Sequence, residues 1–189
     1  MIDKSVREEQ QTSNGDKYLL RDFVVREVVR GIPNHGQEYE DACVGRVFHW
    51  IKTNIAYIQD PTDYDMYMTV GRTISSGAGD CDDHCIAVCS MLTLLGFRTG
   101  ARICSPDGSA WHIYAIAGVR PWNNPQKIVA LDTTQEESYP GWEPPPVMRA
   151  YEMQTTFVLG KPQTLLVTRW AGKEKGGIAA SRVKGVAGL

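Results

Sequence analysis

The composition is that of an ordinary globular protein. The chain has 189 residues, of which 42% are hydrophobic and 22% charged, and this length allows one domain with a substantial core. A formal net charge of −2 gives no reason to expect a nucleic-acid or anionic-membrane partner for the body of the protein. Because no stretch has the apolar length of a secretory signal or a transmembrane helix, we expect a cytoplasmic protein or part of an assembly made in the cytoplasm.

The first third of the sequence has mainly helical periodicity. Residues 1–17 are polar and include an Asn-Gly turn signal, so we expect a polar N-terminal tail. Residues 18–33 place apolar side chains at helical spacing and end with a glycine and a proline, which predicts a first helix. Residues 37–58 predict a second, longer helix, with acidic residues early and Lys52 late, as the helix dipole favours. Residues 59–79 contain several Gly and Ser residues and predict a loop that crosses the surface.

The middle of the chain predicts one more helix and then a sheet. Residues 82–95 form an apolar run closed by Gly96, which is typical of a helix with a glycine just after its end. Three runs with alternating or β-branched residues follow, and we expect them to be neighbouring strands of an antiparallel sheet: 97–104, 111–119 and 127–132.

The last part of the chain is less regular. Residues 133–152 contain three consecutive prolines, which remove three backbone donors, so we expect this segment to wrap the outside of the domain. Residues 156–160 and 163–170 predict edge strands. Residues 171–189 are basic and rich in glycine, and we expect a flexible C-terminal tail. The domain itself is therefore expected at residues 18–170.

One short stretch concentrates residue types that carry chemistry. Residues 77–85 read GAGDCDDHC and lead into the apolar run of the third helix, so Cys81 falls at a helix start. The positive end of a helix and a nearby imidazole are two environments that favour the reactive thiolate of a cysteine. The two glycines allow close backbone approach in front of the thiol. The three acids are expected to cap the first turn: Asp80, Asp82 and Asp83.

A histidine and an aspartate on the predicted strands complete a candidate nucleophilic site. His112 lies in the strand at 111–119, where a rigid backbone can aim an imidazole. Asp132 ends the next strand, where its carboxylate can orient that ring. Cys81, His112 and Asp132 are therefore the candidate catalytic residues, as nucleophile, base and orienting acid. Taken singly, they have structural alternatives: a buried thiol, a core histidine and a turn cap.

A zinc site is an alternative for the same stretch. Cys81, His84, Cys85 and Cys89 are suitable ligand types, but residues spread over two turns of one helix cannot surround an ion. We therefore expect no metal and no cofactor. Cys85 and Cys89 recur on the apolar face of the helix, which predicts that they lie in the core. His84 is expected to contact the loop before Cys81 or to influence its electrostatics.

The order of these motifs resembles the transglutaminase-like superfamily, relatives of the papain-like fold. That family combines Gly-Asp-Cys at a helix start, a glycine after the helix, a strand with His and a strand ending in Leu-Asp. The corresponding stretches here are GDCDDH, LLGFRTGAR, WHIYA and ALDTT, and HWIKTNIAYIQDP is similar to the segment before the cysteine. The match spans residues 20–145. Many members have Trp after the catalytic His, whereas here Trp111 precedes it, so the resemblance assigns no role to that indole.

The resemblance implies an α+β fold, with N-terminal helices and a cysteine-bearing helix packed on an antiparallel sheet, and a Cys81, His112, Asp132 triad. It also implies acyl transfer through the cysteine on a protein or peptide substrate, as a peptidase or amidase or in protein crosslinking. The stretches CDDH, HIYA and GWEPP are similar to a phage-associated subgroup. An alternative function is therefore a structural component of a phage particle, located in the virion, which docks on neighbouring virion proteins through its two tails.

Overall fold

The computed structural model of the chain describes residues 20–33, 36–61, 66–105, 111–119, 127–144, 149–158 and 161–169. The expected tails at 1–17 and 171–189 lie outside the described residues, so their boundaries and their docking role stay predictions. Within the described ranges, none of the helices has the length and apolar character needed to cross a membrane.

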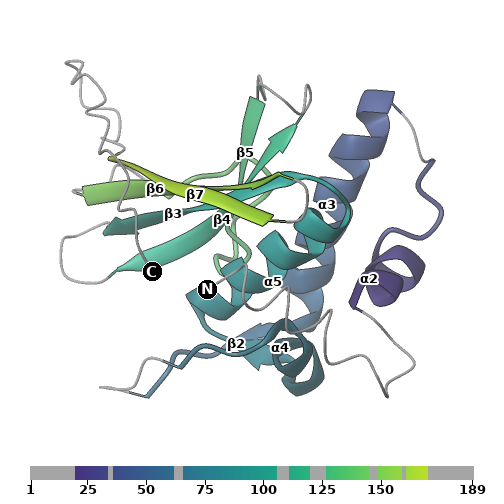
Figure 1. Cartoon of the computed structure of the whole chain (residues 1–189). Helices are drawn as coiled ribbons and strands as arrows, with labels where there is room; N and C mark the ends of the chain where they lie inside the picture. The colour runs from purple at the N-terminus through teal and green to yellow at the C-terminus, as the bar shows by residue number, and fades with distance from the viewer. Residues whose placement is uncertain are drawn as a thin grey trace.

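The helices precede most of the sheet along the chain (Figure 1). They are α2 (Leu20–Phe23), the π-helix η2 (Val24–Val28), α3 (Gly36–Asn54), α4 (Val70–Ser76) and α5 (Cys81–Leu94). The predicted second and third helices are confirmed as α3 and α5, although α3 ends four residues before the predicted boundary at residue 58. The predicted first helix is confirmed as helical but changes type within its length. There the N–H of Val29 donates to the carbonyl of Val24, five residues earlier, at 2.9 Å.

The predicted loop at 59–79 is wrong in its second half, where α4 forms. Thr69 has extended backbone just before α4, and its side chain accepts a hydrogen bond from the backbone N–H of Arg72, which caps the helix. On either side of this region, β1 (Ala56–Tyr57) and β2 (Ala78–Gly79) pair as two short parallel strands. This pairing holds the segment that leads into α5 beside the end of α3.

Five antiparallel strands form the main sheet, in the order β5-β4-β3-β6-β7. They are β3 (Arg98–Ser105), β4 (His112–Val119), β5 (Lys127–Leu131), β6 (Arg149–Val158) and β7 (Lys161–Arg169). The three strands predicted in the middle of the chain are confirmed as β3, β4 and β5. They are neighbours in the sheet, as expected.

The prediction for the fourth strand is wrong both in the residue at which the strand begins and in its place in the sheet. We expected irregular chain up to residue 152 and an edge strand at 156–160. Instead, β6 begins at Arg149 and lies inside the sheet, between β3 and β7, and β7 alone of these two is at the edge. Pairing with β3 supplies hydrogen-bond partners for β6 from a segment far away in sequence, and local composition does not reveal such pairing.

The core lies around α5, which sits between the sheet and the other helices (Figure 1). α5 contacts β3 and β4 on one side and α3 and α4 on the other. Its side chains from Asp82 to Leu92 are all buried, and full burial of one large apolar side chain contributes about 1.5–3 kcal/mol. This packing fixes the start of α5 relative to β4. The expected α+β class, with a cysteine-bearing helix packed on an antiparallel sheet, is confirmed.

Candidate active site

Cys81 is the first residue of α5, and its surroundings leave the thiol accessible. Of the five cysteines, Cys81 is half-buried and the other four are buried. Asp80 is the N-cap, and its Oδ1 accepts hydrogen bonds from the backbone N–H groups of Asp82 (3.1 Å) and Asp83 (3.4 Å). Gly79 is required before the cap, because a Cβ there would lie 2.6 Å from the Cβ of Asp83. The thiol therefore lies at the positive end of a capped helix.

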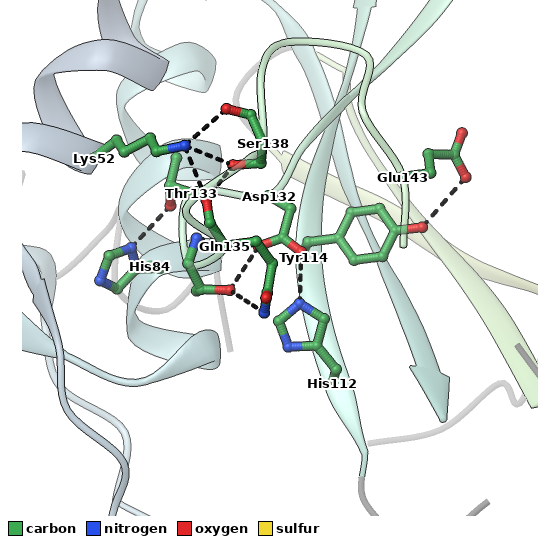
Figure 2. A network of polar contacts seen from close by, with 10 residues as sticks. Lys52, His84, His112, Tyr114, Asp132, Thr133, Gln135, Ser138 and Glu143 are labelled. Carbon is green, nitrogen blue, oxygen red and sulfur yellow. Dashed lines mark hydrogen bonds and ion pairs between the residues drawn. The ribbon is translucent and has the colours of Figure 1, made fainter. Parts of the chain in front are cut away.

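His112 and Asp132 meet at neighbouring ends of β4 and β5. His112 is the first residue of β4 and Asp132 directly follows β5, and antiparallel pairing brings these strand ends together. His112 Nε2 lies 2.7 Å from Asp132 Oδ2 (Figure 2). The other oxygen of the fully buried Asp132 accepts bonds from the N–H and the hydroxyl of Thr134, at 3.1 and 2.7 Å. Cys81 lies near enough to the His112 ring to help raise the pKa of that ring, so all three residues singled out by the sequence lie together.

His112 and Asp132 favour each other's charged forms. Burial alone would lower the pKa of His112, but hydrogen bonds and electrostatic attraction from Asp132 and Cys81 outweigh it and raise this pKa to about 9. Burial alone would raise the pKa of Asp132, yet its bonds to His112 and Thr134 lower it. At neutral pH the imidazole is therefore protonated between a carboxylate and a sulfur. A cysteine nucleophile needs this distribution of charge.

Three carboxylates converge at the same helix start. One oxygen from each of Asp80, Asp82 and Asp83 lies within 4.8 Å of the other two, and all three residues are buried. Asp83 Oδ1 accepts the backbone N–H of Met68 at 2.8 Å, whereas Asp82 Oδ1 has no hydrogen-bond partner among the described residues. Burial, together with the hydrogen bond and charge of Asp80, raises the pKa of Asp82 to about 9. Bringing these acids together costs free energy, and a proton or a cation lowers that cost.

The sequence predicted caps where the structure has a cluster. Capping is confirmed for Asp80, but Asp82 and Asp83 are turned into a shared buried region rather than serving only the first turn. The signal was present in the spacing, since three acids within four positions of one helix start must lie close together. Their burial could not be predicted from the sequence, because it depends on contacts with other segments, such as the hydrogen bond from the backbone N–H of Met68 to Asp83.

His84, one turn into α5, ties this helix to the end of β5. Its Nδ1 lies 2.8 Å from the hydroxyl oxygen of Thr133, the residue after Asp132 (Figure 2). The expected contact with the loop before Cys81, or an influence on its electrostatics, stays a prediction. The ring is 2% exposed, and burial lowers its pKa. Tyr57 meets it edge-on, with ring centroids 6.4 Å apart.

The other two cysteines of α5 belong to the core, as predicted. Cys85 and Cys89 are both buried, and Cys89 Sγ donates a hydrogen bond to the carbonyl of Gly100 at 3.1 Å. These thiols therefore face the sheet rather than a common centre with His84. In the part of the chain that the structure describes, the converging group of metal-ligand side chains is the aspartate cluster instead.

Comparison with known proteins identifies relatives by structure. No protein-family model matches the chain, and no curated protein sequence matches it. The fold is similar to calcium-bound LapG of Legionella pneumophila, with a TM-score of 0.55 and 16% identity over 100% of this chain and 93% of that one. It is also similar to two further Legionella pneumophila LapG structures, one of them EGTA-treated. Each has a TM-score of 0.50 and 15% identity over 79% of this chain, and the match covers 82% and 80% of those chains. This likeness establishes the expected transglutaminase-like fold.

Proposed function

We propose that the chain is a transglutaminase-like cysteine acyl-transfer enzyme, most simply a peptidase. Cys81 is the nucleophile, His112 the base and acid, and Asp132 the orienting carboxylate. The observation that carries this proposal is the His112 ring, which lies 2.7 Å from the buried Asp132 carboxylate and whose pKa is raised by both Asp132 and the nearby Cys81. The likeness to LapG supports a cysteine-protease function on this fold, with a protein or peptide as substrate.

In the first half-reaction the Cys81 sulfur attacks the carbonyl carbon of a substrate amide, and the electron pair of the C=O bond moves to oxygen. The backbone N–H of Cys81, at the positive end of α5, is suited to donate to that oxygen. His112 gives its proton to the amide nitrogen as the C–N bond breaks. The amine leaves, and the acyl group stays on Cys81 as a thioester.

In the second half-reaction the neutral His112 takes a proton from water, whose oxygen attacks the thioester carbonyl. The C–S bond breaks, the acid leaves, and the imidazolium and sulfur anion are restored. Asp132 binds Nε2 and so keeps Nδ1 directed to the reacting side. If an amine takes the place of water, the product is a new amide, which is protein crosslinking.

The test compares wild type with Cys81→Ala on a proteome-derived peptide mixture, followed by mass spectrometry of the products. We expect Cys81→Ala to lose about 10⁴-fold or more in turnover, because no other group replaces the sulfur. Cys43→Ala is the matched control, since it removes a buried thiol on α3. Equal turnover by wild type and Cys81→Ala would reject the proposal. A parallel reaction with an added primary amine separates hydrolysis from transfer, since only transfer adds the mass of the amine.

The aspartate cluster fits a calcium ion, and we propose that Asp80, Asp82 and Asp83 hold one. One of the similar LapG structures is calcium-bound. Calcium takes carboxylate and carbonyl oxygens as ligands, and here three buried carboxylates converge, with Asp82 Oδ1 lacking a partner among the described residues. When bound, the ion supplies positive charge beside the helix start.

Thermal unfolding tests this cation site without any measure of activity. We expect excess calcium to raise the melting temperature of wild type relative to EGTA, because binding to the folded state stabilises it. Asp82→Asn should abolish most of that rise, and magnesium should replace calcium poorly, since it demands a smaller octahedral site. Identical melting of wild type in calcium and in EGTA would show that the cluster holds no calcium.

A further inference from the structure

Lys52, near the end of α3, places its ammonium group among the carbonyls of a distant segment. Lys52 Nζ donates to the carbonyls of Gln135 and Glu136, both at 2.8 Å, and to the carbonyl of Ser138 at 2.7 Å (Figure 2). It also lies 3.0 Å from the Ser138 hydroxyl oxygen. Because an ammonium has three N–H donors, the three carbonyls use them fully. The apolar side is covered by Phe48, whose ring centroid is 5.6 Å away.

The segment bound by Lys52 connects by hydrogen bonds to the Asp132 carboxylate. The side-chain amide of Gln135 donates to the hydroxyl oxygen of Thr134 at 3.3 Å. That hydroxyl and the Thr134 N–H both donate to Asp132 Oδ1, and Asp132 Oδ2 meets His112. A continuous series therefore leads from the ammonium of Lys52 to the imidazole of His112.

We infer that Lys52 is a positioning residue: by fixing the turn at 133–138, it sets the direction of the Asp132 carboxylate toward His112. This inference deepens the proposed function and rests on it. Lys52 itself touches neither the thiol nor a bound substrate. It acts through Gln135, whose side-chain amide donates to Thr134, and Thr134 in turn donates to the oxygen of Asp132 that His112 does not use.

A simpler role for Lys52 would be to fasten the turn to α3 for stability alone. The two roles differ in their effect on His112, which faces Asp132 from the end of β5 and Cys81 from α5, with the Tyr114 ring stacked 6.0 Å away. Loss of a stabilising contact alone would leave the His112 pKa unchanged. Loss of the Lys52 charge would by itself raise that pKa, because a like charge is removed. A misdirected carboxylate lowers it, so the sign of the change identifies the role.

The experiment is an NMR titration of the His112 ring in wild type, Lys52→Met and Lys127→Met, with the signal assigned by its loss in His112→Gln. Methionine keeps much of the length of lysine and removes its charge and donors. We expect the His112 pKa to fall by about one unit in Lys52→Met, since part of its bond to Asp132 is lost. Lys127→Met removes an exposed charge from β5 and should leave the titration as in wild type. An unchanged or raised His112 pKa in folded Lys52→Met would overturn the inference.

A second variant keeps the test decisive if Lys52→Met does not fold. Ser138→Ala removes the hydroxyl that contacts Lys52 and donates to the carbonyl of Gln135 at 2.8 Å, and it should lower the His112 pKa in the same direction by a smaller amount. No change in folded Ser138→Ala would then overturn the inference. Failure of the proposed function gives a different result, because wild-type His112 would itself titrate near its ordinary pKa. Failure of this inference leaves wild-type His112 raised and the Lys52 variant identical to it.

Discussion

Two imidazoles lie at the end of β5, the half-buried His112 and the buried His84, and they are held in opposite protonation states. His112 meets the carboxylate of Asp132, and its pKa is raised to about 9. His84 meets the hydroxyl of Thr133, the very next residue, and its pKa is lowered. Burial acts in the same direction on both rings, so the partner decides the outcome. The two partners, Asp132 and Thr133, are adjacent in the chain, yet one holds a charged ring and the other a neutral one.

The difference shows that two adjacent residues, Asp132 and Thr133, serve different rings. Asp132 meets the ring of His112, which lies near the half-buried thiol of Cys81. Thr133 faces the body of α5, where a charged ring would lack compensation and a neutral one needs only a hydroxyl. The His84 bond also joins the helix that carries Cys81 to the strand end that carries Asp132. Five substitutions and a pH series can break or sharpen this contrast.

The largest effect is expected for Asp132→Asn, which keeps the shape of the side chain and removes its charge. Turnover should fall about 10³-fold or more, because the imidazole loses its orientation and its favoured tautomer. The pKa of His112 should fall with it. The measurements are kcat on a cleaved peptide and the NMR titration of the ring. A variant with near wild-type turnover would show that the carboxylate does not serve His112.

The next effect is a loss of stability at alkaline pH. The folded pKa of His112, about 9, is above its ordinary value of 6.5, so the pair with Asp132 stabilises the fold fully below pH 6.5 and is lost as the pH rises through 9. Between these limits the free energy of unfolding should fall by roughly 2 to 3 kcal/mol. Urea unfolding at a series of pH values measures it.

The matched comparison for this series is His112→Gln beside His84→Gln. Asp82 also has a raised pKa of about 9 and contributes a fall in the same range, so the variant curves are needed to separate the two groups. His112→Gln should remove the part of the alkaline fall that comes from His112 and leave the part that comes from Asp82, and His84→Gln should retain the whole fall. If both variants keep the full fall, His112 is not the group responsible.

A smaller effect is expected for Thr133→Val, which removes the hydroxyl partner of His84 at nearly constant volume. The free energy of unfolding should fall by about 1 to 2 kcal/mol, because a buried ring nitrogen loses its partner. Turnover should change by less than about tenfold, since Asp132 keeps its contacts with Thr134 and His112. A loss of turnover as large as that of Asp132→Asn would mean that the two imidazoles are not independent.

The smallest effect is expected for Thr134→Val. This change removes the hydroxyl bond to Asp132 Oδ1 but keeps the backbone N–H bond to the same oxygen. Turnover should fall by only about threefold to tenfold, with a small drop in the His112 pKa, since one neutral hydrogen bond is worth about 1 kcal/mol. Steady-state kinetics measures it, and turnover equal to wild type would show that the backbone bond alone aims the carboxylate.

Much of this arrangement could be predicted from the sequence, because its signals are local. Alternating residues mark β4 and β5, and a cysteine before an apolar run marks the start of α5. The positions of His112 and Asp132 then predict that their side chains lie close together, since β4 and β5 are adjacent short strands in one antiparallel sheet. The geometry agrees with that prediction. Their catalytic role is a matter for experiment.

The features that the sequence did not reveal depend on contacts between distant segments. α4 is short and contains Gly and Ser residues of low helix propensity, and its cap at Thr69 was the available local signal. β6 follows a proline-rich stretch and is held by pairing with β3. Lys52 reaches carbonyls 83 to 86 residues away, and nothing near it in sequence indicates that destination. Contacts of this range come only from the folded chain.

The most direct test of the central claim is alkylation of the folded protein by iodoacetamide at pH 6, followed by peptide mapping. Ordinary thiols are scarcely ionised at this pH, and four of the five cysteines are buried, so modification should be rapid and confined to Cys81. His112→Gln should slow it by about tenfold or more, because a positively charged ring close to the sulfur favours alkylation and this ring is gone. Equal rates in wild type and His112→Gln would contradict the account, since the reactivity of the Cys81 thiol would then not depend on the imidazole.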